Sequence, residues 1–179
     1  MHKIDGNDKE EKLLKALARG LNPIAKRFKG FVINGYRFHT KDLEKKGRTQ
    51  NSGVMVEVEG EIWYGRLVDI LELDYYGEYK VVVFQCEWVD INSSRGIKRD
   101  AYGGTCVNFS KLIHTSQYLK DDPFIFYSQA KQVFYLEDAK DEGWLHVVKT
   151  KPRDLYELHA TLESIYDDDD RDTYTQCLS

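Results

Sequence analysis

Residues 63–88 read WYGRLVDILELDYYGEYKVVVFQCEW and combine strand-forming side chains with one glycine-containing turn. They predict a β-hairpin in which residues 62–74 pair antiparallel with residues 78–91, because Asp74-Tyr75-Tyr76-Gly77 supplies a glycine where the turn needs one. Val81 and Val83 make the second face of the second strand partly apolar, so this strand is predicted to be central in its sheet. Its first apolar face, predicted to be buried, comprises Val82, Phe84, Cys86 and Trp88.

Other strand patterns flank this hairpin. Asn34-Gly35 accepts the positive φ angles of a type I′ turn and predicts a second hairpin over residues 31–38. Three valines at 54, 56 and 58 alternate with other residues, which predicts a half-buried strand. Further strands are predicted at 105–113, 132–136 and 144–148. So many short strands with few helices favour a mainly β (α+β) fold, a small antiparallel β-barrel, and Gly65 predicts a bulge or sharp bend in it.

The two ends of the chain have different patterns. Asp8 is a predicted N-cap, Leu13, Leu14 and Leu17 form an apolar stripe, and Gly20 is a predicted helix stop. One helical turn is predicted within 124–130, and a weak final helix is predicted from Asp154. We therefore divide the chain into an N-terminal helical extension (1–22), a β-barrel domain (23–153) and an acidic, disordered C-terminal tail (154–179).

Composition excludes several classes of protein. The 179 residues are 41% hydrophobic and 31% charged, as in an ordinary globular domain. No apolar run is long enough to span a bilayer, and the polar, acidic N-terminus does not resemble a signal or transit peptide. The three cysteines have no CxxC spacing, so neither a disulfide framework nor a zinc knuckle is predicted. These features predict a reduced, intracellular protein that makes no contact with membranes.

Motifs that carry catalysis are also missing from the sequence. It has no phosphate-binding glycine loop and no nucleophile elbow, and its five histidines are not spaced as metal ligands on a helix. Carboxylates of the hairpin could be imagined to hold two magnesium ions, but they lie on one hairpin and its flanks, where solvent exposure explains them. We expect no enzyme activity, no metal, no cofactor and no small-molecule substrate.

Charge is distributed unevenly along the chain. Residues 154–179 contain eight acidic residues against Arg171, a net charge of −7. Residues 23–50 contain eight basic residues against Asp42 and Glu44, a net charge of +6. This basic segment is either a solubilising loop or a contact for nucleic-acid phosphates. The candidate nucleic-acid-binding residues are Lys26, Arg27, Lys29, Arg37, Lys41, Lys45, Lys46 and Arg48.

Four aromatic residues of the hairpin form a second candidate site. Trp63, Tyr64, Tyr75 and Tyr76 lie near acidic residues and could capture a cation, such as methyl-lysine, against their rings. Packing in the core or in the turn is the alternative explanation of the same four residues, and the sequence favours it.

Several blocks of the chain resemble a known family. NGYRFHT, TQNSGV, VNFS and QVFY, together with the pattern of the central hairpin, closely resemble the plant domain-of-unknown-function family numbered 4216. The resemblance extends over about residues 23–154. That family occurs in proteins encoded by CACTA (En/Spm-type) DNA transposons, and it provides no catalytic residues to transfer. The hairpin followed by VNFSKLI and QVFYLED is also similar in pattern to SH3-like barrels of the bromo-adjacent-homology (BAH) kind.

The resemblance and the charge pattern together lead to one functional expectation. The chain is expected to be a non-catalytic, nuclear accessory module of a CACTA-type transposon protein that contacts DNA or chromatin. The alternative is a protein–protein interaction module that binds a transposase or another protein, or that oligomerises, without nucleic acid. In the first case, the acidic tail is expected to compete with nucleic acid for the basic segment.

Overall fold

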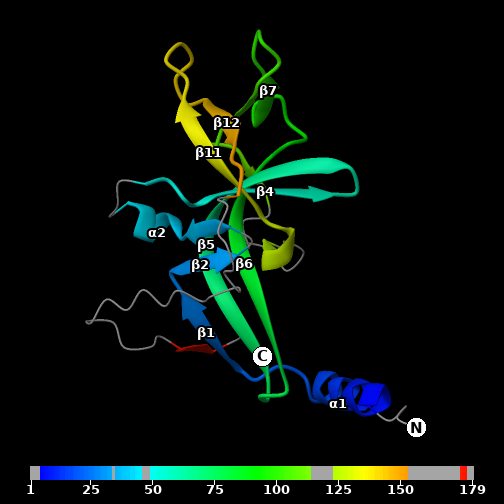
Figure 1. Ribbon diagram of the computed structural model, residues 1–179. Coiled ribbons are helices and arrows are strands. Elements are labelled where there is room, and N and C mark those ends of the chain that lie inside the picture. The colour runs from blue at the N-terminus through cyan, green and yellow to red at the C-terminus, as the bar shows by residue number, and fades with distance from the viewer. Residues whose placement is uncertain (1–4, 34, 46–48, 114–122, 153–173, 177–179) are drawn as a thin grey trace.

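The computed structural model describes residues 5–33, 35–45, 49–113, 123–152 and 174–176. The protein is mainly β: an antiparallel, strongly curled half-barrel sheet with two short helices (Figure 1). The predicted fold class is therefore confirmed, with the barrel half closed.

The helices are α1 (Asp5–Arg19) and α2 (Lys41–Glu44), and η1 (Tyr127–Gln129) is a 3-10 turn. The strands are β1 (Ile24–Phe28), β2 (Gly30–Ile33), β3 (Tyr36–His39), β4 (Gly53–Val58), β5 (Glu61–Tyr75), β6 (Tyr79–Val89), β7 (Ile97–Arg99), β8 (Thr105–Val107), β9 (Leu112–Ile113), β10 (Phe124–Phe126), β11 (Lys131–Glu137), β12 (Leu145–Lys149) and β13 (Tyr174–Gln176).

The long hairpin β5–β6 is the axis of the sheet, as the sequence predicts. It turns at Tyr76 and Gly77, whose φ angles are 53° and 80°, and Ile70 pairs with Phe84 near its middle. In Figure 1, α1 lies at the turn of this hairpin, and β7, β11 and β12 lie at its opposite end. The hairpin therefore connects two ends of the molecule that have different neighbours.

The predicted bulge lies elsewhere than expected. The register of β5 against β6 shifts between Leu67 and Asp69, so the extra residue is Val68. Of the two alternatives predicted at Gly65, a bulge or a sharp bend, the bulge is therefore not at that position. Gly65 instead pairs with Trp88, and a Cβ at position 65 would lie 2.7 Å from the Trp88 ring. Glycine is needed at position 65 for a close contact, which sequence alone does not distinguish from a bulge.

Strand β11 links the two parts of the sheet. It pairs with β4 at Lys131 and Gln132, and its pairing with β12 begins at Val133. β12 in turn pairs with β8, and β8 pairs with β7. β1 pairs with β5 on the same edge as β4, opposite β6, but farther along the strand, at Ile70–Glu72. β11 changes partner within seven residues, and this change accompanies the strong curl of the sheet.

Buried side chains form two clusters, one on each face of the central strands. Val54 and Val56 belong to one cluster, whereas Met55 between them belongs to the other, because successive side chains of a strand point to opposite faces. The four residues predicted to be buried on β6 all belong to the first cluster, which confirms the predicted register. The first cluster extends beyond the central hairpin, because it also includes Phe28, Phe31, Ile33, Phe38, Val54 and Val56.

Aromatic rings hold the β2–β3 hairpin onto the central sheet. Phe31 and Phe38 contact Phe84 edge to face, with ring centroids 5.6 and 5.2 Å apart, and Phe31 also contacts Tyr127. The hairpin turns at Gly35, whose φ angle is 76°, as predicted for an Asn-Gly turn. A local turn and non-local aromatic contacts thus position the same element.

Helix α1 ends as predicted but begins earlier. Gly20 adopts a φ angle of 83° just after the helix, whereas the helix begins at Asp5 and not after a cap at Asp8. The predicted apolar stripe is exposed, with Leu14 65% exposed, whereas Ala16 is buried. None of the described helices is long and apolar enough to cross a membrane.

Two irregular segments differ from their predictions. Residues 105–113 form two short strands, β8 and β9, and not one. Residues 124–130 form β10 followed by the 3-10 turn, because β10 pairs with β6. Cys86 and Cys106 are buried free cysteines. The predicted helix from Asp154 and the run Asp167–Asp170 lie outside the described residues; of the tail, only β13 is described, paired with β1 at Ile24–Lys26.

Candidate nucleic-acid interface

Strand β1 carries the first two candidate cations. Ala25 and Phe28 are buried against the sheet, Arg27 projects outward, and Lys26 is half-buried. The Lys26 ammonium lies 5.1 Å from the centroid of the Phe28 ring, and Arg27 Nε lies 2.7 Å from Asp69 Oδ2. The pairing of β1 with β5, in which Arg27 lies opposite Leu71, brings one of these cations into contact with the bulged part of β5.

The next cations lie where β2, β3 and α2 meet. The Thr40 amide donates to the Lys29 carbonyl, at 2.9 Å, and the Thr40 hydroxyl accepts from the Leu43 amide as the N-cap of α2. This contact places the exposed residue Lys29 beside the first turn of α2. The exposed residue Arg37 lies on β3, where its carbonyl accepts a hydrogen bond from the Gln132 side chain.

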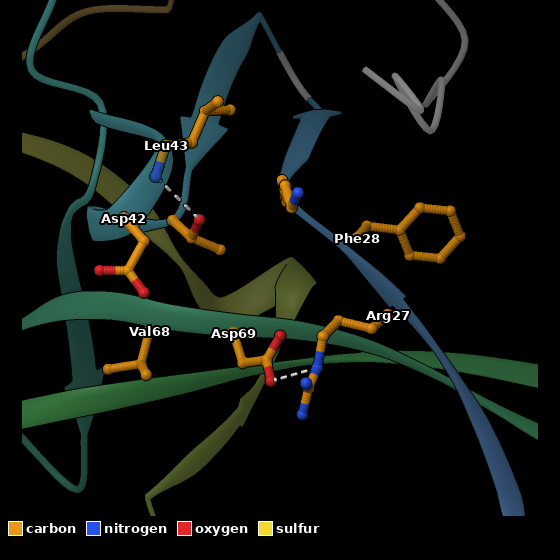
Figure 2. A pocket seen from close by; sticks show the side chains of 8 residues that line it. Arg27, Phe28, Asp42, Leu43, Val68 and Asp69 are labelled. Carbon is orange, nitrogen blue, oxygen red and sulfur yellow. Dashed lines mark hydrogen bonds and ion pairs between the residues drawn. The ribbon is translucent and has the colours of Figure 1, made fainter. Parts of the chain in front are cut away.

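A cavity of about 390 Å³ lies between these elements (Figure 2). Its charged lining comprises Arg27 and Lys29 against Asp42 and Asp69, and Val68 of the bulge also lines it. Two cations balance two carboxylates, so the cavity is not by itself an anion-binding site. A phosphate contact in this region would have to involve the rim and the surrounding cations.

Helix α2 carries two further candidates, and both form ion pairs. Lys41 pairs with Glu87 of β6, and Lys45 pairs with Asp42 at 3.0 Å. The side chains of Lys45 and Asp42 are 72% and 74% exposed, so this pair contributes little to stability and can exchange its partner at low cost. Lys46 and Arg48 lie outside the described residues.

The candidate aromatic residues do not form a common site. Tyr64 is buried, and Trp63 packs against the other face of the sheet. Tyr75 and Tyr76 lie at the far end of β5, about 36 Å away at about 3.3 Å per residue. Only Tyr76 among the four is largely exposed, at 53%. An aromatic cage built from all four residues is therefore geometrically impossible, and core and turn packing account for their positions.

Asp69 is the ionisable group that burial perturbs at this interface. Its Oδ1 accepts from the Ile70 amide, at 3.0 Å. Burial raises the pKa of the Asp69 carboxyl above its ordinary value of 3.8, and the Arg27 guanidinium opposes this rise without cancelling it. The folded protein therefore binds this proton more tightly than the unfolded chain does.

The pH dependence of stability follows from this shift. The stabilisation linked to the protonated Asp69 is fully present below pH 3.8 and is lost as the pH rises through the raised pKa. We expect the free energy of unfolding of the wild type, relative to that of Asp69→Asn, to decrease over this interval. Urea denaturation of both proteins at a series of pH values measures the difference. If the free energy of unfolding of the wild type, relative to that of Asp69→Asn, instead increases with pH, the ion pair with Arg27 outweighs the effect of burial on the Asp69 pKa.

One group of potential ligands was missed from the sequence. Asp100, Cys106 and His146 lie together, although Cys106 and His146 are 40 positions apart. The sequence predicts a strand around each of the last two residues, but no local pattern indicates that these strands pair. Such a cluster can be found only from the pairing of β8 with β12.

A family model described as a domain of unknown function (DUF4216) matches residues 71–148. Residues 71–148 are a DUF4216 domain. The DUF4216 domain begins within β5 and ends within β12, and it contains Asp100, Cys106 and His146. All eight candidate cations precede it in the chain. No curated protein and no solved structure matches the chain.

Proposed function

We propose that this protein is a non-catalytic, nuclear accessory module of a plant CACTA-type transposon protein, and that it contacts DNA through residues 26–48. The observation that supports a DNA contact is the net charge of +6 over residues 23–50. Its described part runs through β1, β2, β3 and α2, which are consecutive and are joined by the contact of Thr40 with Lys29. Transposon origin is inferred from the resemblance to family 4216.

The ion pairs of this segment define what kind of binding is expected. Arg27 and Lys41 form ion pairs with carboxylates of the central hairpin. Each of them would have to break its ion pair to contact a phosphate. Lys45, the residue after α2, is exposed, and within the described part of the chain its ion pair is with Asp42. We therefore expect binding that depends mainly on phosphate charge and not on base sequence.

The test is the salt dependence of DNA binding. Lys45, Lys46 and Arg48 are changed together to alanine, and the anisotropy of labelled duplex and single-stranded oligonucleotides is titrated at several salt concentrations. Each lost phosphate contact lowers the slope of log K against log salt by about one, so the triple variant should lower it by up to about three. Cleavage of the duplex on addition of magnesium would contradict a non-catalytic role.

A matched control removes the same charge elsewhere. Lys140, Lys149 and Lys151 are exposed and lie at the β11–β12 end of the molecule. Their simultaneous change to alanine should leave the salt slope unchanged. If the salt slope decreases equally in both triple variants, or if nothing binds even at low salt, the basic segment is only a solubilising surface.

A second candidate function is an interaction with another protein at the edge of β1. Here Ile24–Lys26 pair with Tyr174–Gln176, so this edge accepts an added strand. Removing residues 167–179 distinguishes the two functions. In the DNA proposal, loss of the acidic residues tightens oligonucleotide binding, more at low salt than at high salt. In the protein proposal, the exposed edge causes self-association that depends weakly on salt.

A further inference from the structure

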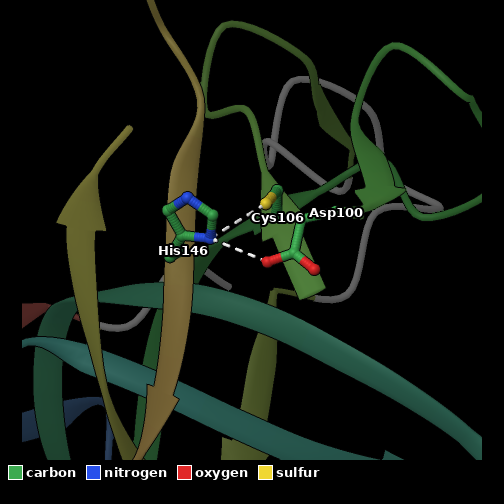
Figure 3. A group of neighbouring side chains, drawn as sticks. All are labelled: Asp100, Cys106 and His146. Carbon is green, nitrogen blue, oxygen red and sulfur yellow. Dashed lines mark hydrogen bonds and ion pairs between the residues drawn. The ribbon is translucent and has the colours of Figure 1, made fainter. Parts of the chain in front are cut away.

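We propose that Asp100, Cys106 and His146 form a binding site for a divalent transition-metal ion, and that zinc is the ion this ligand set fits best. Figure 3 shows the three side chains converging between β7, β8 and β12. The Cys106 Sγ lies 3.2 Å from His146 Nδ1, which lies 3.4 Å from Asp100 Oδ2. All three ligand atoms lie within 4.8 Å of one another.

Strand pairing brings the three residues together. Cys106 of β8 lies directly opposite His146 of β12 in the antiparallel register. Arg99 of β7 pairs with Thr105 of β8, so Asp100, the next residue after β7, lies beside the same point of the sheet. The site therefore rests on three strands of the DUF4216 domain and not on a flexible loop alone.

Backbone contacts fix the Asp100 carboxylate. Its Oδ1 accepts from the amides of Tyr102 and Gly104, at 2.8 and 2.7 Å, which leaves Oδ2 on the side of His146. A Cβ at position 104 would lie 2.5 Å from Oδ2, so the glycine makes room for this carboxylate position. One oxygen is thus held by the protein while the other is available to an ion.

Asp138 orients the histidine ring. Its Oδ2 lies 3.2 Å from His146 Nε2, and its Oδ1 accepts from the Lys140 amide at 2.9 Å. A neutral imidazole that donates from Nε2 to Asp138 directs the lone pair of Nδ1 toward Cys106 and Asp100. A carboxylate behind a histidine ligand is the arrangement that commonly fixes the tautomer of metal-binding histidines.

The donor set indicates the class of ion. Zinc bonds of about 2.0–2.3 Å in tetrahedral geometry place ligand atoms about 3.3–3.7 Å apart, close to the two spacings observed. Thiolate and imidazole select zinc over magnesium or calcium, and the charges of Cys106 and Asp100 together neutralise a divalent ion. Three protein ligands leave a fourth position for water.

Access and competing charge are compatible with this site. Cys106 is buried, but the His146 side chain is 34% exposed, so an ion can enter from the solvent side. A metal ion is bound by the thiolate form of cysteine, so binding at Cys106 replaces the thiol proton. The nearby cation Lys98 has partners outside the three ligands, because its ammonium pairs with Asp141 and lies 4.1 Å from the centroid of the Trp144 ring.

The test uses the full chain with zinc and cobalt(II) as probes. We expect one equivalent of zinc by calorimetry, release of protons on binding, and a thiolate-to-metal charge-transfer band with cobalt. Cys106→Ser should abolish that band, and His146→Gln should weaken zinc binding at least tenfold. Asp138→Asn should weaken zinc binding by about 10–100-fold and keep the cobalt band, because it acts only through His146.

Cys177→Ser is the matched control, because it removes a thiol outside the described residues and should leave both signals unchanged. His146→Gln decides the question if Cys106→Ser does not fold. The proposal is overturned if zinc does not bind, or if binding survives His146→Gln unchanged. In that case His146 serves only as a polar contact between Asp100 and Asp138.

Discussion

Phe84→Ala lowers the free energy of unfolding by about 3–5 kcal/mol, the range expected for removal of a fully buried phenyl ring. Phe84 is 0% exposed and contacts both Phe31 and Phe38 edge to face. The substitution therefore leaves a cavity at the point where the β2–β3 hairpin packs on the central sheet. Because a domain of this size is stable by only about 5–15 kcal/mol, the substitution removes a large part of the free energy of unfolding. Urea denaturation followed by far-UV circular dichroism measures the loss.

Phe126→Ala is the control for this substitution. Phe126 lies on β10, beside the same strand β6, but its side chain is 54% exposed. Its removal should cost less than about 1 kcal/mol, because little area is returned to water. Equal losses for the two variants would mean that the first cluster is not the part of the core that determines stability.

Gly53→Ala destabilises the protein by about 3 kcal/mol, at the upper end of the usual cost of overpacking. Gly53 lies on β4 opposite the point where β11 passes from β4 to β12. A Cβ at position 53 would lie 2.1 Å from the Val133 carbonyl oxygen. A backbone atom cannot move aside as a side chain can, so the new methyl group has to separate β4 from β11.

The control for this clash is Gly60→Ala. Gly60 has a φ angle of 85° in the turn between β4 and β5, and a Cβ there would meet no atom within 4 Å. Only conformational strain of about 1 kcal/mol is expected. A thermal-shift comparison of the two variants separates a steric clash from strain. If Gly53→Ala unfolds at the temperature of Gly60→Ala or above it, β4 and β11 are not in close contact at this point.

Part of the candidate nucleic-acid interface was predictable from the sequence because it is a local property. The basic segment is contiguous, so its excess charge can be counted without a fold. The partners of its cations come from distant positions: Arg27 pairs with Asp69, and Lys41 with Glu87. The effective charge of the segment was therefore not predictable, because it depends on carboxylates that β5 and β6 bring to it.

The sequence by itself determined the elements whose signal repeats over a few residues. Alternation in β6 predicted its buried face, and Asn34-Gly35 and Gly77 predicted two hairpin turns, because strand period and positive φ angles are properties of neighbouring residues. Only the tertiary structure decided where strands from distant segments meet. The bulge at Val68, the change of partner along β11 and the meeting of Cys106 with His146 all depend on non-local pairing. No local pattern in the sequence predicts such pairing, because the contacts that stabilise it form only when both distant strands have come together.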